Sequence, residues 1–94
     1  MKQNIATEVK TDLIEISLRW FSVLAEKRGK RAETIKVKQG ITGSNLINSL
    51  SSDFEMLAKY KNHVRLAVNR EYVEPDQVLS DGDEVAFITP VSGG

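Results

Sequence analysis

Hydrophobic and polar residues alternate along two segments in the first half of the chain, LIEISLRW at residues 13–20 and ETIKVKQG at residues 33–40. A period of two is typical of a β-strand that buries one face. The side chains expected to point inward are those of Ile14, Ile16, Leu18, Trp20, Ile35 and Val37. Between the two segments, FSVLAEKRG ends in a charged run and Gly29, which predicts a short helical turn closed by glycine. The pattern therefore predicts two strands with a hairpin-like return.

The period becomes that of a helix between residues 41 and 60, in ITGSNLINSLSSDFEMLAKY. The apolar residues at helical spacing are Leu46, Ile47, Leu50, Phe54, Leu57 and Ala58. Thr42 or Ser44 is available as the N-cap, and Ile41 is placed to pack against the first turn. The Ser-Ser-Asp run at residues 51–53 can break the segment into two helical pieces.

Two shorter strands and a turn are predicted after the helix. The strands lie in VRLAVN, residues 64–69, and REYVEPDQ, residues 70–77, and SDGD at residues 80–83 supplies a tight turn because glycine tolerates a positive φ. This order predicts the α+β class, with a mixed sheet of four to five strands packed on one main helix. Residues 1–12 are polar and without periodicity, so we expect a flexible leader before one domain at residues 13–89.

The last strand is predicted in EVAFIT, with Val85 and Phe87 on the core face and Ala86 and Ile88 on the other. Ala86 and Ile88 are expected to form an exposed apolar patch with Phe21, and such a patch is typical of a surface that docks on partner proteins. The alternative is that another element of the fold covers these side chains.

The residues after the last strand, 90–94, are predicted to form a flexible tail. Pro90 has no N–H to give to a sheet, so strand pairing should end there. From Thr89 to Gly94 the chain reaches on the order of 16 Å if it extends about 3.3 Å per residue, far enough to enter the active site of another protein. Gly93 and Gly94 lack Cβ atoms and can thread a narrow channel. A frayed chain end is the other interpretation of the same glycines.

The amino-acid composition excludes several kinds of reactive site and leaves the tail as the candidate. The chain has no cysteine and one histidine, so disulfides, zinc–thiolate sites and thiol nucleophiles are excluded. We expect the histidine, His63, to be an ordinary surface residue and predict no metal site. No apolar run approaches the ~20 residues of a membrane span, and no secretory signal is present, which predicts a cytoplasmic protein without a membrane partner. The remaining candidate for reaction is the terminal carboxylate of Gly94.

The formal net charge of zero conceals an asymmetry along the chain. All thirteen lysines and arginines lie between Lys2 and Arg70, together with seven acids, so this part carries +6, whereas residues 71–94 contain the six other acids and carry −6. The C-terminal end is therefore expected to prefer a partner with a basic surface or pocket. The alternative is that these acids are solvated turn residues. The interspersed charges give no surface that follows a phosphate backbone, so no nucleic-acid partner is expected.

The stretch AVNREYVEPDQVLSDGDEVAFITPVSGG, together with the opening strand and SVLAEKRG, resembles the ubiquitin-like β-grasp sulfur carriers, most closely those of the molybdopterin synthase type. The resemblance covers roughly residues 13–94 and is most specific in DGDEVAFI and PVSGG. It implies that an ATP-dependent activating enzyme adenylates the terminal carboxylate and that a sulfur-donor system converts it to a thiocarboxylate. The sulfur would then pass to cyclic pyranopterin monophosphate in the large catalytic subunit of molybdopterin synthase.

The resemblance also implies roles for individual residues. Gly94 would be converted transiently to a glycyl adenylate and would then carry the sulfur as 1-thioglycine. Gly93 would keep the chain narrow next to it. The insertion path would be lined by Pro90, Val91 and Ser92. Thr89 stands where the family more usually has the first of two prolines, which puts the stiffness of the tail in doubt. The chain itself would be no enzyme and would hold no permanent cofactor, because the catalytic pocket is expected on the partner subunit.

Three other functions are compatible with the same sequence. A thiazole-pathway sulfur carrier uses the same terminal thiocarboxylate with a different acceptor. A ubiquitin-like protein modifier joins the same glycine to lysines of target proteins. A plain binding module would use the face of its sheet and ignore its tail.

Overall fold

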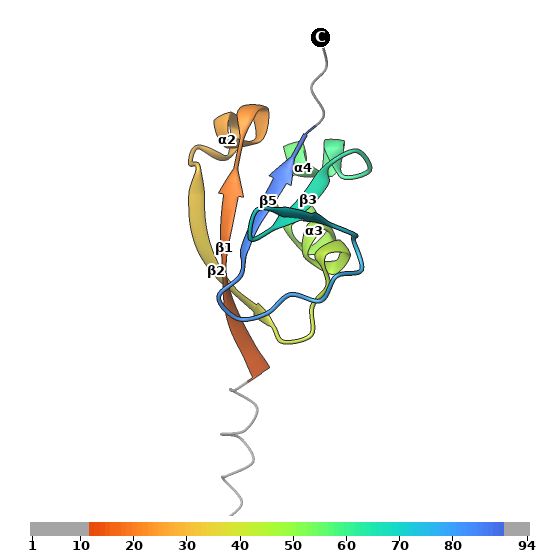
Figure 1. Ribbon diagram of the computed structural model, residues 1–94. Coiled ribbons are helices and arrows are strands. Elements are labelled where there is room, and N and C mark those ends of the chain that lie inside the picture. Colours follow the sequence, from red (N-terminus) through yellow and green to blue (C-terminus); the bar gives the residue numbers. More distant parts are fainter. Residues whose placement is uncertain (1–11, 90–94) are drawn as a thin grey trace, which may run out of the picture.

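The computed structural model describes residues 12–89, so the predicted tail and all but the last residue of the predicted leader lie outside the described residues. Along the chain the elements are β1 (Leu13–Trp20), α2 (Ser22–Arg28), β2 (Ala32–Lys38), α3 (Gly43–Ser51), α4 (Glu55–Tyr60), β3 (Arg65–Val68), β4 (Glu71–Val73) and β5 (Glu84–Ile88) (Figure 1). The five strands form one sheet in the order β2-β1-β5-β3-β4. Strands β1 and β5 are parallel, and the other neighbours are antiparallel, which confirms the predicted mixed sheet.

Strands β1 and β2 form the predicted hairpin-like pair, with Ile16 opposite Ile35. The four apolar residues of β1 that alternate in the sequence are all buried, and Ile35 and Val37 of β2 pack against the same core. Between the strands, α2 ends at Gly29, whose φ of 82° lies in the left-handed region that glycine adopts without steric cost. The N–H of Gly29 donates to the carbonyl of Ala25, so this end of the helix is closed as the sequence predicts.

The helical segment is divided into α3 and α4, as the polar run at residues 51–53 allows. Thr42, rather than Ser44, is the N-cap of α3, since its Oγ1 accepts a hydrogen bond of 3.1 Å from the N–H of Asn45. Phe54 lies between the two helices in extended conformation and is buried. Because α4 begins anew after Phe54, Leu57 faces the core while Ala58 is exposed.

Aromatic side chains from three segments meet at the centre of the core. The ring of Trp20 stacks on Phe87 at 5.0 Å between centroids, and Phe54 approaches it edge-on at 5.3 Å. Trp20 and Phe87 are register partners in the parallel pair of β1 and β5, so the sheet itself brings their rings together. Helices α3 and α4 cover this side of the sheet (Figure 1), which we call the closed face.

The opposite side of the sheet, the open face, carries the alternate residues of the same strands. Strand register places Arg19 next to Ala86, Ala86 next to Ala67, and Ala67 next to Tyr72, so these four residues form one row across β1, β5, β3 and β4. Tyr72 is among the large apolar side chains that remain exposed. This face borders the end of β5, from which residue 90 follows.

Candidate functional site

A hollow of about 440 Å³ lies on the open face, beside the C-terminal end of β5. Its apolar lining comes from Phe21, Ala67, Tyr72, Ala86 and Ile88, and its polar lining comes from Arg19, Arg70 and Glu84. The structure thus brings together the three residues that the sequence predicts as an exposed patch, namely Phe21, Ala86 and Ile88. We call this feature the open-face hollow.

Among the apolar residues that line the open-face hollow, Phe21 and Tyr72 are the most exposed. Phe21 is 42% exposed and Tyr72 is 58% exposed, while Ala86 and Ile88 between them are half-buried. No element among residues 12–89 covers the four side chains completely, so the patch is open to contact from another molecule. Its role in docking stays a prediction.

Sequence reasoning missed Tyr72 and Ala67 as parts of this hollow. The alternation of Glu71, Tyr72 and Val73 predicts that Tyr72 faces away from the core. Which side chains lie beside it depends on strand order, because β3 and β4 pair next to β5 rather than at the far side of β1. That order follows from the fold as a whole and leaves no local signal in the sequence.

A small ionic cluster forms the polar edge of the hollow. Arg19 donates from Nη1 to Oε2 of Glu84 at 2.8 Å, and Nε of Arg70 lies 3.8 Å from Oε1 of the same carboxylate. Arg70 is the second residue of the two-residue turn between β3 and β4, and both Asn69 and Arg70 have positive φ, as a type I′ hairpin requires. Glu84 therefore lies between two guanidinium groups.

Two acids of the predicted SDGD turn have defined partners within the domain. Asp81 accepts a hydrogen bond of 2.8 Å from the N–H of Glu15, and Asp83 accepts one of 2.8 Å from the N–H of Ser80 and one of 3.0 Å from the Asn69 side chain. Gly82 between them has a φ of 88°. These acids lie before β5, at the opposite end of the strand from residue 90, and they hold the turn.

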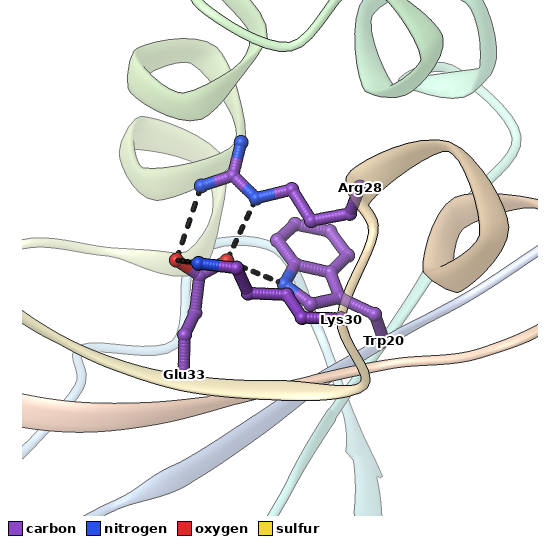
Figure 2. A network of polar contacts seen from close by, with 4 residues as sticks. All are labelled: Trp20, Arg28, Lys30 and Glu33. Atoms are coloured by element: carbon purple, nitrogen blue, oxygen red, sulfur yellow. Dashed lines mark hydrogen bonds and ion pairs between the residues drawn. The ribbon is translucent and has the colours of Figure 1, made fainter.

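A second polar network fixes Trp20, the register partner of Phe87, from β2 and α2 (Figure 2). Glu33 accepts a hydrogen bond of 2.7 Å from Nε1 of Trp20 and another of 2.7 Å from Nε of Arg28, and Lys30 lies 3.7 Å from its other oxygen. The hydrogen bonds from Arg28, with those from Trp20 and the nearby positive charges, hold the pKa of Glu33 below its ordinary value despite partial burial, which acts in the opposite direction. The guanidinium of Arg28 also lies over the rings of Trp20 and Phe54.

The tail residues predicted to react or to line the insertion path are Pro90, Val91, Ser92, Gly93 and Gly94, and they lie outside the described residues. Thr89 is the last residue described and is half-buried. His63 is exposed in the turn after α4, as expected of a surface residue. Among residues 12–89 there is no group of acidic or histidine side chains that could hold a metal ion. In the same part of the chain, no helix is long and apolar enough to cross a membrane.

A mixed sheet in the order 2-1-5-3-4, grasping a helical segment and presenting an apolar hollow beside the last strand, defines a β-grasp domain of the ubiquitin-like kind. The chain belongs to the ThiS family, whose model matches residues 18–94 and so extends through the tail to Gly94. This match confirms the resemblance to β-grasp sulfur carriers found in the sequence.

Two relatives illustrate the functions found among similar sequences. The human molybdopterin synthase sulfur carrier subunit is 41% identical over 85 residues, which cover 87% of this chain and 97% of the human protein. The small archaeal modifier protein 3 of Haloferax volcanii is 32% identical over 92 residues, covering 86% of this chain and all of that protein.

Solved structures agree with the fold. A putative molybdopterin converting factor, subunit 1, from Pyrococcus furiosus superposes with a TM-score of 0.70 at 27% identity, over 83% of this chain and 99% of that one. A designed protein based on ubiquitin superposes with a TM-score of 0.58 at 22% identity, over 87% of this chain and 94% of that one. The second likeness concerns the fold alone and confirms the ubiquitin-like β-grasp architecture.

Proposed function

We propose that this chain is the sulfur carrier subunit of a molybdopterin synthase. In this role the domain at residues 13–89 is a handle, and residues 90–94 are the arm that brings the carboxyl group of Gly94 into the large catalytic subunit. The observation that carries the proposal is the family match that includes Gly94, on a domain whose open-face hollow adjoins the strand leading into the tail. The human relative bears the name of such a subunit.

The chemistry at Gly94 requires activation, because a carboxylate is resonance-stabilised and its oxygen is a poor leaving group. A carboxylate oxygen attacks the α-phosphorus of ATP in the activating enzyme and releases pyrophosphate, which leaves an acyl adenylate. A sulfur nucleophile at the oxidation level of sulfide then attacks the carbonyl carbon, and AMP departs with the oxygen. The product is a thiocarboxylate in which one oxygen has become one sulfur, without net oxidation or reduction.

Delivery of the sulfur takes place in the partner's pocket. The thiocarboxylate sulfur attacks an oxygen-bearing carbon of cyclic pyranopterin monophosphate, and the carbon–oxygen bond there breaks, so that the oxygen leaves with the electron pair. Water then cleaves the bond between that sulfur and the Gly94 carbonyl. The carboxylate is restored and the sulfur stays on the pterin. None of these steps needs a cysteine from this chain, which agrees with its composition.

The two terminal glycines are explained by steric access to the reacting carbonyl. Gly93 and Gly94 have no side chains that would block a nucleophile approaching the carbonyl or widen the channel that admits the tail. Pro90, Val91 and Ser92 are proposed to line the path of insertion. Phe21, Ala86 and Ile88 are proposed to anchor the handle on the partner, together with Tyr72.

Mass spectrometry of the intact protein tests the first half of this proposal. After incubation with ATP, a sulfur donor and a matching activating enzyme, we expect one oxygen to be replaced by one sulfur, at Gly94. The thiocarboxylated protein is then mixed with the large molybdopterin synthase subunit and cyclic pyranopterin monophosphate, and molybdopterin is measured.

A deletion of Gly93 and Gly94 is the matched variant for both measurements. It leaves the described domain untouched and should abolish thiocarboxylate and molybdopterin formation completely. A truncated protein that still supports molybdopterin formation would contradict the proposal and favour a plain binding module.

A protein modifier is the second candidate function, and the specific observation in its favour is the archaeal relative named as a modifier. Immunoblots of cell extracts distinguish the two functions. A ladder of covalent adducts at higher mass that requires Gly94 would favour conjugation, whereas sulfur transfer alone leaves the protein at its own mass.

A thiazole-pathway carrier is separated from the molybdopterin type by its acceptor. The thiocarboxylated protein is offered in parallel to the thiazole-forming enzyme and to the large molybdopterin synthase subunit. Delivery to the thiazole system alone would replace the molybdopterin assignment while leaving the chemistry at Gly94 intact.

A further inference from the structure

The open-face hollow carries more positive than negative charge, although the last quarter of the sequence is acidic. Arg19 and Arg70 line it with a single carboxylate, that of Glu84, and both arginines share that one partner. Arg65 adds a third guanidinium, which lies over the ring of Tyr72 at 4.1 Å. Three cations thus surround an apolar surface that contains one anion.

The positive charges are also the accessible ones. The side chain of Arg70 is 85% exposed, that of Arg19 is 42% exposed, and that of Glu84 is only 29% exposed. Within residues 12–89, Arg65 is exposed and has no ion pair with an acid. A molecule that approaches the hollow therefore meets guanidinium groups before it meets the carboxylate.

The acids of the last quarter do not offset this charge at the hollow. Asp81 and Asp83 are engaged in the turn before β5, and Glu84 lies between two arginines. Of the six acids of the last quarter, only Glu84 lines the open-face hollow, so most of the acidic end expected from the sequence lies outside that lining. The tail is still predicted to prefer a basic partner site, whereas the open-face hollow is suited to an acidic partner surface.

We infer that the open-face hollow recognises an acidic surface, namely an apolar side chain of the large molybdopterin synthase subunit flanked by carboxylates that face Arg19, Arg65 and Arg70. This inference rests on the proposed function and adds the charge of the partner's docking surface. Apolar contact supplies most of the affinity in such an interface, while the charges at its edge set the association rate and exclude partners of the wrong sign.

The experiment measures association of the full-length protein with the large subunit from the same organism by stopped-flow fluorescence. The double variant Arg65→Gln/Arg70→Gln removes two charges at the edge of the hollow. Since electrostatic steering raises association rates by orders of magnitude at low salt, we expect association to slow by about tenfold. At ~0.02 M salt the effect should be large, and at ~1 M salt, where the Debye length is about 3 Å, it should nearly vanish.

Two further variants fix the sign and the location of the effect. Glu84→Gln removes the single anion of the hollow and should speed association, by roughly two- to threefold at low salt. The control Lys27→Gln/Lys59→Gln removes the same net charge from exposed positions on α2 and α4 and should change the rate far less.

Unchanged rates for the arginine variant, or faster association, would overturn the inference. So would an equal slowing in the lysine control, because the effect would then belong to net charge. The proposed function has a separate readout, since molybdopterin formation at saturating concentrations does not depend on the association rate. If the wild-type protein forms molybdopterin but the arginine variant associates at the wild-type rate, only the inference is refuted. If the wild-type protein neither binds the large subunit nor transfers sulfur, the proposed function is refuted.

Discussion

The two faces of one sheet differ in what their residues do, although adjacent positions of the same strands supply both. In β5, Val85 and Phe87 point to the closed face and are fully buried, while Ala86 and Ile88 point to the open face and stay half-buried. On the closed face, aromatic rings and helix side chains fill the space. On the open face, a row of small and apolar residues leaves a hollow edged by arginines.

The difference between the faces shows how one sheet can combine a folding core with a surface that stays open to contact. The closed face supplies the free energy of folding, because burial of apolar surface is the dominant favourable term. The open face remains free for contacts with partners, since its side chains contribute little to the core. Substitutions on the closed face should therefore change stability, and those on the open face should change binding.

The largest expected effect is that of Phe87→Ala on the closed face. This substitution removes the ring that stacks on Trp20 and leaves a cavity at the centre of the core. Phe→Ala changes in cores cost about 3–5 kcal/mol, a large part of the ~5–15 kcal/mol that keeps a small domain folded. Urea denaturation followed by tryptophan fluorescence measures the loss.

The neighbouring residue provides the control for that experiment. Ile88→Ala, on the open face of the same strand, should cost well under half as much. Equal losses for Phe87→Ala and Ile88→Ala would contradict the division of the sheet into a folding face and a binding face.

A smaller loss is expected from Gly43→Ala, at the start of α3. A Cβ at this position would collide with Cδ2 of the buried Leu66 and lie 3.2 Å from the carbonyl oxygen of Pro75, which belongs to the backbone and cannot rotate away. Crowding of this kind costs about 1–3 kcal/mol, more than alanine gains over glycine at a helix end. Thermal unfolding should show the loss, while Ser44→Ala, one residue further and exposed, should leave the midpoint nearly unchanged.

Much of the closed face could be predicted from the sequence, because each of its elements has a local signal. Alternation marks Ile14 to Trp20 as a strand, and Gly29 marks the end of α2. The polar run at residues 51–53 also predicts the break between α3 and α4, whereas the local sequence leaves both Thr42 and Ser44 available as the N-cap. Local periodicity is enough here because burial on one side imposes it.

The open face was predicted only in part. Phe21, Ala86 and Ile88 were found from their position outside the predicted core, but Tyr72 and the arginines were not. Their place beside β5 depends on long-range pairing, in particular that of β3 with β5 in the register of Ala67 with Ala86. The charge of the hollow depends on this pairing and on that of β1 with β5, which together bring Arg70 and Arg19 to the carboxylate of Glu84.

A further prediction concerns the polar network that supports the closed face at Glu33. Glu33→Gln retains an oxygen that can accept from Trp20 but removes the charge that Arg28 and Lys30 face. Hydrogen bonds to a charged group contribute about 1.5–3 kcal/mol, and the glutamine keeps part of this, so we expect a loss of about 1–2 kcal/mol at neutral pH.

The pH dependence of that loss has a definite sign. Because the pKa of Glu33 is lower in the folded protein than its ordinary value of 4.5, the stabilisation is present above that value and disappears as the pH falls through the folded pKa. The stabilities of wild type and Glu33→Gln should therefore converge on acidification. Urea midpoints at pH 7 and at a series of lower pH values test this, with Glu26→Gln on the exposed side of α2 as the control. A difference that stays constant as the pH falls below 4.5 would contradict the charged role of Glu33.

The smallest expected change in stability belongs to Tyr72→Ala, and it gives the sharpest test of the comparison between the faces. The ring is 58% exposed, and its loss removes only an exposed contact with the Arg65 guanidinium, worth about 0.5–1 kcal/mol. Binding should lose more than stability, because tyrosine is enriched among the interface residues that contribute 2 kcal/mol or more, which corresponds to a loss of affinity of about thirtyfold. Calorimetric titration against the large molybdopterin synthase subunit measures the affinity, and thermal unfolding measures the stability of the same sample.

Val78→Ala is the matched control, since Val78 is 53% exposed but does not line the hollow, and neither quantity should change much. If Tyr72→Ala lowered stability strongly and left affinity intact, the open face would be part of the folding core, and the separation of roles between the two faces would not hold.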